Sequence, residues 1–276
     1  MQTDNIIYSA TMLQDYVECP RRFQLKYVLN QSWPSIPVEP ILELEQLSAR
    51  GRQFHFLAHQ FFAGVSIAAI VSAITDATLR HWFDRFLEFT QAQKWLLTMS
   101  EIRLAAPFDQ HRIIAVYDLI ARTQDEHVHI FDWKTSFQPP KESVMARRMQ
   151  TIIYPFVLYE NLPRLFPTSE DDQKPALAMH YWYPEYPDSS ITFTYDPIQH
   201  QENTQILSDL LEEIDTRCAA SYFPLTDKKM RCKYCQYRSL CDRGINAGRS
   251  DQDSTEYLTD IVDIDFNSLP DINADI

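Results

Sequence analysis

The chain has little glycine, with four glycines in 276 residues. None of them stands in a G-x-G-x-x-G or G-x-x-x-x-G-K arrangement. In those two patterns the glycines let a backbone loop approach the phosphates of a nucleotide, so their absence excludes a phosphate-binding loop of either kind. We therefore expect no nucleotide cofactor, and we do not expect the protein to act as a motor by itself.

A long hydrophobic run is also missing. The longest apolar stretches, such as residues 64–74, are shorter than the roughly 20 residues that a helix needs to cross a bilayer. The first residues show no basic segment followed by an apolar one, which is the pattern of a secretory signal. The sequence predicts no membrane association and a cytoplasmic location.

Cysteine is scarce, and the five cysteines argue against a disulfide framework in a reducing compartment. Cys232, Cys235 and Cys241 form a C-x2-C-x5-C cluster, while Cys19 stands alone near the start. Four thiolates can hold either zinc or an iron-sulfur cluster, and spacing alone does not separate the two. Cys218 lies on a predicted helix, where a small buried thiol is the expected role.

Positive charge is in deficit, because the net charge is -13. Phosphate binding normally rests on Lys and Arg, so this balance disfavours a nucleic-acid partner at first sight. However, residues 251–276 hold eight of the acidic residues and no Lys or Arg. We interpret this segment as an acidic, disordered tail, with a docking peptide or a DNA-mimicking segment as alternatives. Residues 1–250 are long and apolar enough to form one domain.

Hydrophobic periodicity predicts both helices and strands. Apolar residues recur every three or four positions in some segments and alternate in others. Thr11 is expected to cap the first helix, with Gln14 as its reciprocal cap. The order of the elements predicts an α/β fold with a mixed central sheet flanked by helices. The expected helices cover residues 8–28, 41–63, 67–95, 142–160 and 201–220, and the expected strands cover residues 101–105, 112–121, 127–133, 176–182 and 191–195.

A D-x-K motif ends one of these strands. Asp132 and Lys134 are two residues apart and therefore project from the same face, whereas Trp133 points away into packing. A carboxylate can bind Mg²⁺ or Mn²⁺, and a neighbouring ammonium can orient a water molecule and balance charge on phosphorus. Asp118, at the end of the preceding strand, would supply a second carboxylate. An isolated D-x-K is common, and a solvated strand end is the alternative.

The motifs together resemble the RecB-like branch of the PD-(D/E)xK nuclease superfamily, which includes the Cas4 and AddB nuclease domains. The resemblance runs through most of residues 8–244. It covers a G-x-x-D strand at residues 115–118, the D-x-K motif and a Q-x-x-x-Y helix at Gln150 and Tyr154. The family's opening motif is matched, with Thr in place of the second Ser, at Ser9, Thr11, Leu13, Tyr16, Cys19, Pro20 and Phe23.

This resemblance implies a restriction-endonuclease-like core and a role for each motif residue. Lys134 would act on the attacking water, and Gln150 and Tyr154 would hold the DNA or support the site. A [4Fe-4S] cluster would join the two ends of the domain, with zinc as the alternative. The implied metal ligands are His55, Asp118, Asp132 and the Trp133 carbonyl, and the implied cluster ligands are Cys19, Cys232, Cys235 and Cys241.

Several residues qualify the resemblance. Ala115 stands where the family has Gly, and Pro155 follows the motif Tyr and is expected to kink its helix. His59 lies one turn after His55 and competes with it as the metal ligand. Glu101 could add a carboxylate, although a plain surface acid is the favoured interpretation.

The sequence thus predicts a Mg²⁺- or Mn²⁺-dependent DNA nuclease, an exonuclease acting on single-stranded or end-processed DNA. The expected context is repair and recombination or CRISPR adaptation, with a helicase or CRISPR adaptation proteins as partners. One alternative is a catalytically weak DNA-binding or scaffold subunit of a helicase-nuclease complex. Another is a zinc-stapled adaptor that binds protein.

Overall fold

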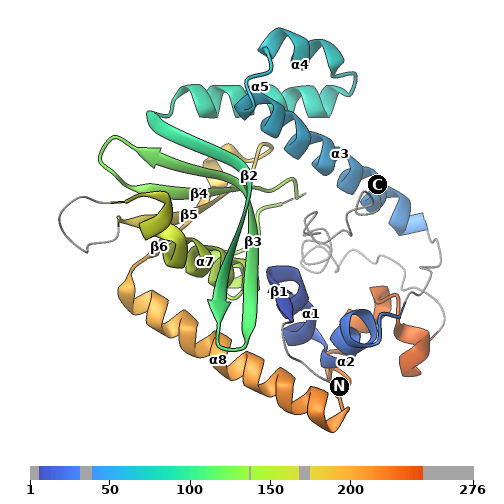
Figure 1. Cartoon of the computed structure of the whole chain (residues 1–276). Coiled ribbons are helices and arrows are strands. Elements are labelled where there is room, and N and C mark those ends of the chain that lie inside the picture. The colour runs from blue at the N-terminus through green and yellow to red at the C-terminus, as the bar shows by residue number, and fades with distance from the viewer. Residues whose placement is uncertain (1–5, 32–38, 137, 168–174, 245–276) are drawn as a thin grey trace, which may run out of the picture.

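The computed structural model describes residues 6–31, 39–136, 138–167 and 175–244. The expected acidic tail at residues 251–276, and the domain boundary before it, lie outside these residues. The structure is an α/β fold built on a six-stranded mixed sheet (Figure 1). Its strands are β1 (Ile7–Ser9), β2 (Trp95–Phe108), β3 (His111–Thr123), β4 (Val128–Trp133), β5 (Leu177–Trp182) and β6 (Ile191–Tyr195).

Helices cover both faces of the sheet. The α-helices are α1 (Ala10–Glu18), α2 (Pro20–Phe23), α3 (Glu39–Phe62), α4 (Ile67–Ala73), α5 (Ala77–Gln91), α6 (Glu142–Met145), α7 (Met149–Leu165) and α8 (Pro197–Ala220). Shorter turns are η1 (Gln24–Val28), η2 (Pro187–Ser189), η3 (Lys229–Tyr234) and η4 (Arg238–Cys241). In the described part of the chain, no helix is long and apolar enough to span a membrane.

The strand order creates a fork at the middle of the sheet. β3 pairs with β2 along one edge, and its other edge is shared by β1 and β4. β1 runs parallel to residues 112–114 of β3, whereas β4 runs antiparallel to residues 119–122. Beyond that point β4 leaves β3 and continues beside β5 in parallel. The strands therefore part at residues 115–118, and polar side chains can enter the gap.

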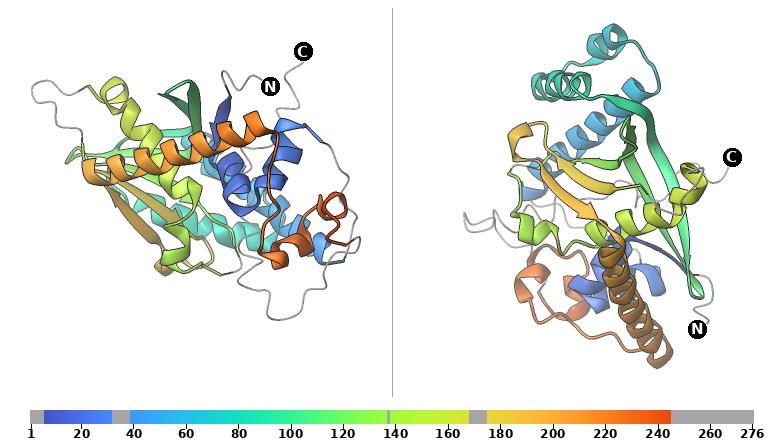
Figure 2. Two further views of the ribbon diagram at one scale, coloured as in Figure 1. Left: turned by 90° about the horizontal axis from the view of Figure 1, so that it is seen from below. Right: turned by 90° about the vertical axis from the view of Figure 1, so that its left-hand side faces the viewer.

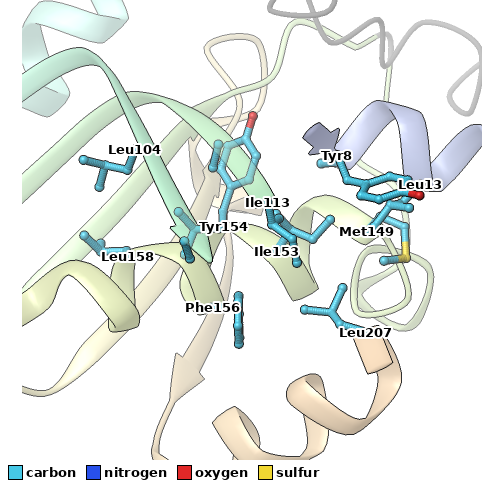
Figure 3. Close-up of a cluster of buried hydrophobic side chains, with 14 of the residues drawn as sticks. Tyr8, Leu13, Leu104, Ile113, Met149, Ile153, Tyr154, Phe156, Leu158 and Leu207 are labelled. Atoms are coloured by element: carbon cyan, nitrogen blue, oxygen red, sulfur yellow. The ribbon is translucent and has the colours of Figure 1, made fainter. Parts of the chain in front are cut away.

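Two apolar cores hold the layers together. The larger core joins one face of the sheet to α1, α7 and α8, with Leu13, Ile153 and Leu207 fully buried in it (Figure 3). The other face packs against α3 and α5, where the rings of Phe86 and Trp133 are nearly perpendicular, with 5.3 Å between their centroids. Each buried aromatic side chain contributes about 2–3 kcal/mol of transfer free energy. The two cores therefore hold the sheet in place from both of its faces.

The first and last described segments meet at one end of the molecule. Both views in Figure 2 place η3 and η4 beside α1 and α2. Phe223 lies in the larger core and packs against Tyr16 and Phe23 of the opening helices. Across the same contact, the Arg21 amide donates to the Pro224 carbonyl at 3.2 Å. The domain is therefore closed by apolar packing and hydrogen bonds between its two ends.

Five local features differ from the sequence-based expectation. The helix expected at residues 142–160 is divided into α6 and α7, with residues 146–148 between them, and residues 8–9 of the expected first helix belong to β1. The helix expected at residues 67–95 is two helices, because the Asp76 carboxylate accepts from the Leu79 amide and starts α5 as a new helix. The strand expected at residue 101 begins at Trp95. Ser9, not Thr11, caps α1, because its hydroxyl accepts from the Met12 amide at 3.2 Å.

Candidate active site

Asp118 occupies the fork between β3 and β4. The backbone pairing of the two strands ends at Leu119 and Phe131. Beyond this pair, an Asp118 carboxylate oxygen accepts a hydrogen bond from the Trp133 amide at 2.8 Å. A side-chain hydrogen bond thus follows where the backbone pairing of β3 and β4 stops. Asp118 is only 7% exposed. Because a buried carboxylate is costly without partners, this hydrogen bond is needed to keep it there.

His55 reaches the same point from α3. Its Nδ1 atom lies 3.0 Å from the second oxygen of Asp118. Burial opposes protonation of the ring, but the charge of Asp118 and the hydrogen bond to it, then the charges of Asp132 and Glu101, raise the pKa of His55 to about 9. His59, one turn later, instead contacts the hydroxyl of Ser100 at 3.0 Å. Of the two histidines, His55 is therefore the one at the fork.

The D-x-K pair lies beside this cluster and is held by a third residue. The Lys134 ammonium is 3.0 Å from one oxygen of Asp132, which is 4% exposed. Gln150, in the first turn of α7, donates to the other oxygen of Asp132 and accepts from Lys134 at 2.9 Å. The amide thus fixes the carboxylate and the ammonium at once. Trp133 points away into the second core, as its place in the alternation predicts.

Glu101, expected from the sequence to be a plain surface acid, is exposed but lies near the fork. The structure gathers a nitrogen of His55 and oxygens of Glu101 and Asp118 within 4.8 Å of one another. Glu101 has a φ of +53° inside β2, a left-handed conformation that residues other than glycine seldom adopt. Desolvation by surrounding protein atoms and the charge of Asp118 raise the pKa of Glu101 to about 7, although the charge of His55 opposes this.

A signal for Glu101 was present in the sequence. Asp109 and Gln110 form the two-residue turn of the β2–β3 hairpin, so Phe108 pairs with His111. Counting back in equal steps from that turn places Glu101 opposite Asp118. The observed register agrees, because the pairs on either side of this position are Ser100 with Leu119 and Ile102 with Tyr117.

Tyr154, the last residue of the Q-x-x-x-Y motif, is buried in the larger core. Its side chain is 2% exposed within the larger core, where its ring packs against Tyr117 at 5.1 Å (Figure 3). The Tyr117 hydroxyl donates to the backbone carbonyl of Tyr154 at 2.8 Å. This position suits a residue that supports α7 and not one that contacts DNA.

Among the cysteine residues of the two chain ends, neighbouring thiols raise the pKa values of Cys235 and Cys241. Cys19 ends α1, and Cys232, Cys235 and Cys241 lie on or next to η3 and η4. Burial raises the pKa of the Cys241 thiol, and the neighbouring Cys19 and Cys232 raise it further. Burial and the charges of Cys19 and Cys241 do the same for Cys235. The four side chains therefore belong to one electrostatic neighbourhood.

Two arginines act on the cysteines of the chain ends, whereas the fifth cysteine lies elsewhere. The charge of Arg22 favours the Cys235 thiolate, and the charge of Arg21 favours the Cys241 thiolate. Cys218 is buried on α8, within the larger core.

Comparison with known proteins gives two kinds of similarity. The model of the PD-(D/E)XK nuclease superfamily matches residues 7–242. The crystal structure of a "Putative exonuclease" from Eubacterium rectale has a TM-score of 0.53 at 10% identity, covering 89% of this chain and 91% of that one. That of SSO0001 has 14% identity and covers 89% of both chains, but its TM-score of 0.40 is too low to bear on the fold. No curated protein matches.

The family match spans the motifs that meet at the fork. It begins at β1, includes the strands that carry Glu101, Asp118 and Asp132, and ends after Cys241. The solved structure from Eubacterium rectale shares the fold of a mixed sheet flanked by helices. The chain belongs to the PD-(D/E)XK nuclease superfamily.

Proposed function

We propose that the protein is a Mg²⁺- or Mn²⁺-dependent deoxyribonuclease, an exonuclease acting on single-stranded or end-processed DNA. The observation that carries this proposal is the convergence of carboxylates, an imidazole and an ammonium at the fork of β3 and β4. Family membership supports hydrolysis of phosphodiester bonds. The preference for DNA, the choice of metal and the exonuclease mode belong to the proposal.

The charges at the fork fit a divalent cation. A nitrogen of His55 and oxygens of Glu101 and Asp118 lie within 4.8 Å of one another. Burial opposes protonation of His55, but the charges of Asp118, Asp132 and Glu101 raise its pKa. Carboxylate oxygens with one imidazole nitrogen suit Mn²⁺, and carboxylates suit Mg²⁺. His55, Asp118, Asp132 and the Trp133 carbonyl would hold the ion, which would polarise the phosphate and lower the pKa of a bound water.

The protein side chains have separate tasks in this scheme. Lys134 holds a positive charge next to Asp132, where it can orient the attacking water and offset charge that builds on the phosphate. Gln150 keeps that ammonium and the carboxylate in fixed relation. Asp118 is anchored by the Trp133 amide, so the site is assembled before substrate arrives.

The cysteine residues at the two chain ends would hold a [4Fe-4S] cluster. Cys19, Cys232, Cys235 and Cys241 supply four thiols in one neighbourhood. Burial raises the pKa of Cys235 and Cys241, and the charges of Arg22 and Arg21, respectively, partly offset this rise. Thiolates are the usual protein ligands of such clusters. A visible spectrum recorded without oxygen, with iron and sulfide analysis, tests this point. Stoichiometric zinc and no iron would contradict it.

The nuclease proposal is tested with linear single- and double-stranded DNA in the presence of Mn²⁺. Asp132→Asn and Lys134→Ala should each lower the cleavage rate by about 100-fold or more, because each removes a group that acts on the reacting phosphate. Glu126→Gln, at an exposed hairpin turn, is the matched control and should cut normally. Full cleavage by Asp132→Asn and Lys134→Ala would overturn the assignment.

The biological setting is part of the same proposal. End processing of DNA belongs to repair and recombination or to CRISPR adaptation, and the partners would be a helicase or CRISPR adaptation proteins. Co-purification of the chain with a helicase would support the first setting, and co-purification with an integrase would support the second.

A further inference from the structure

Gln14 connects two helices that lie far apart in the sequence. Its side-chain oxygen accepts from the Met149 amide at 2.9 Å, and its side-chain nitrogen donates to Glu18 at 3.0 Å. The first amides of any helix have no acceptor within that helix. At the start of α7, the N-cap residue Arg148 offers no side-chain acceptor. Gln14, a residue of α1, therefore supplies a cap for α7.

This cap lies immediately next to the residue that orders the catalytic pair. Gln150 follows Met149, and its side chain contacts both Asp132 and Lys134. A displacement of the first turn of α7 would therefore move Gln150 away from these two groups. Figure 3 shows Leu13, the neighbour of Gln14, and Met149 at the same end of the larger core.

Gln14 is itself held firmly on the other side. Glu18, which accepts from Gln14, forms an ion pair with Arg22 at 2.5 Å. Arg22 also lies 2.8 Å from Asp15, so α1 and α2 form one charged network. The next residue after Glu18 is Cys19. The network thus extends from the cysteine-bearing end of α1 to the start of α7.

We infer that Gln14 is a positioning residue for catalysis: by capping α7 from α1 it holds Gln150 in reach of Asp132 and Lys134. The inference rests on the proposed nuclease function. Gln14 touches neither of the two charged groups, and its effect passes through the backbone of α7. A misplacement of a catalytic group by about 1 Å can cost on the order of 100-fold in rate, so one cap can matter.

Three variants separate this role from a general loss of stability. Gln14→Met keeps the volume and removes both hydrogen bonds. Gln14→Glu restores an acceptor for the Met149 amide but places a like charge four residues from Glu18, which is unfavourable on a helix. Gln205→Met is the matched control, because Gln205 makes the same kind of bond to Asp209, at 2.7 Å and on the exposed side of α8.

We expect Gln14→Met to lower kcat by about 10-fold or more while KM for DNA changes less than about twofold. Gln14→Glu should recover most of kcat although it melts no higher than Gln14→Met, and Gln205→Met should match the wild type. A role in stability alone predicts that activity follows melting temperature. Equal kcat for Gln14→Met and the wild type would overturn the inference.

Hydrogen exchange at the first turn of α7 provides a readout that does not depend on DNA cleavage. The Met149 amide should exchange faster in Gln14→Met than in the wild type or in Gln205→Met. If the wild type cuts no DNA, the proposed function fails. If the wild type cuts, Lys134→Ala does not, and Gln14→Met retains full kcat, the function stands and the positioning role is wrong.

Discussion

At the residue scale, Glu101 shows how a strained conformation can serve a site. Its left-handed φ falls where β2 passes the fork, and conformations of this kind cost about 1–2 kcal/mol for residues with a Cβ atom. The side chain also brings a carboxyl group next to that of Asp118, and desolvation together with the charge of Asp118 raises its pKa to about 7. Two unfavourable features at one position are typical of a residue kept for function and not for stability.

Glu101→Gln should separate these two effects. The amide keeps the shape of the side chain but removes its charge, so we expect Mn²⁺ to bind about 10-fold more weakly. The metal-free variant should be more stable by about 1 kcal/mol, a value kept low because Glu101 is exposed to solvent. Calorimetric titration with Mn²⁺ and urea unfolding measure the two quantities. Unchanged Mn²⁺ affinity would show that Glu101 does not contribute to metal binding.

At the element scale, the sequence predicted the elements that carry the D-x-K motif more closely than those that flank it. β3 and β4 have strong β-branched and apolar patterns, and they carry the two expected acids, although β3 continues five residues beyond Asp118. The helix expected at residues 67–95 was wrong because Asp76 starts a new helix through its side chain. Trp95 to Ser100 form a strand because they pair with β3, a contact that local pattern does not reveal.

The cap of α7 could not be predicted either, because it joins two segments that are far apart in the sequence. Gln14 and Met149 are 135 positions apart, so local sequence patterns favour a partner for Gln14 within its own helix. The fork was partly predictable, because Asp118 and Asp132 lie on neighbouring strands, but the expectation that Asp118 ends its strand was wrong, since β3 continues to Thr123. The burial of Tyr154 was not, since a helix pattern does not say which face meets the sheet.

Strands β4 and β5 also carry a histidine pair with a testable pH dependence. His129 and His180 contact each other at 2.9 Å, and Thr192 contacts the other ring nitrogen of His180 at 2.9 Å. Burial and the positive charge of His129 lower the pKa of His180 to about 4. In the unfolded chain this ring binds a proton near pH 6.5, whereas in the folded protein it stays neutral down to about pH 4. The folded state therefore has its full stability above about pH 6.5 and loses stability as the pH falls towards about 4.

His180→Gln should therefore flatten the pH dependence of stability in this window. Between pH 7 and pH 5 the wild type should lose about 1 kcal/mol more than the variant, after allowance for partial exposure of the pair. Urea unfolding at the two pH values measures the difference. His81→Gln, on the exposed side of α5, is the control and should follow the wild type. Parallel curves for all three proteins would contradict the assignment.

At the scale of the whole molecule, closure depends on the contact between the two ends of the chain. Phe223 packs against the opening helices, and the Tyr237 hydroxyl donates to the Gln31 carbonyl at 3.0 Å. Arg238 is buried and donates to the carbonyl of Cys235. A cluster bound at the cysteines would add covalent links to these contacts, because metal binding and folding are coupled.

Cys241→Ala should lower the melting temperature of the whole domain by about 10 °C, since a few kcal/mol are lost and each shifts the midpoint by about 2–4 °C. It should also remove bound iron. Cys218→Ala is the control, because that thiol is buried on α8 in the larger core. It should keep its iron and melt closer to the wild type. Differential scanning calorimetry and iron analysis check both variants, and equal melting of the two would argue against a cluster.

The meeting of the two chain ends has a consequence for biosynthesis. A ribosome that adds about 5–20 residues per second needs on the order of 10–40 s to pass from Cys19 to Cys241. From the addition of Lys134 until the addition of Phe223, the nascent polypeptide already carries its acids and its lysine, but α1 has not yet received Phe223 and Tyr237. We expect the half-made chain to be inert, so that cutting begins only after the last segment has emerged.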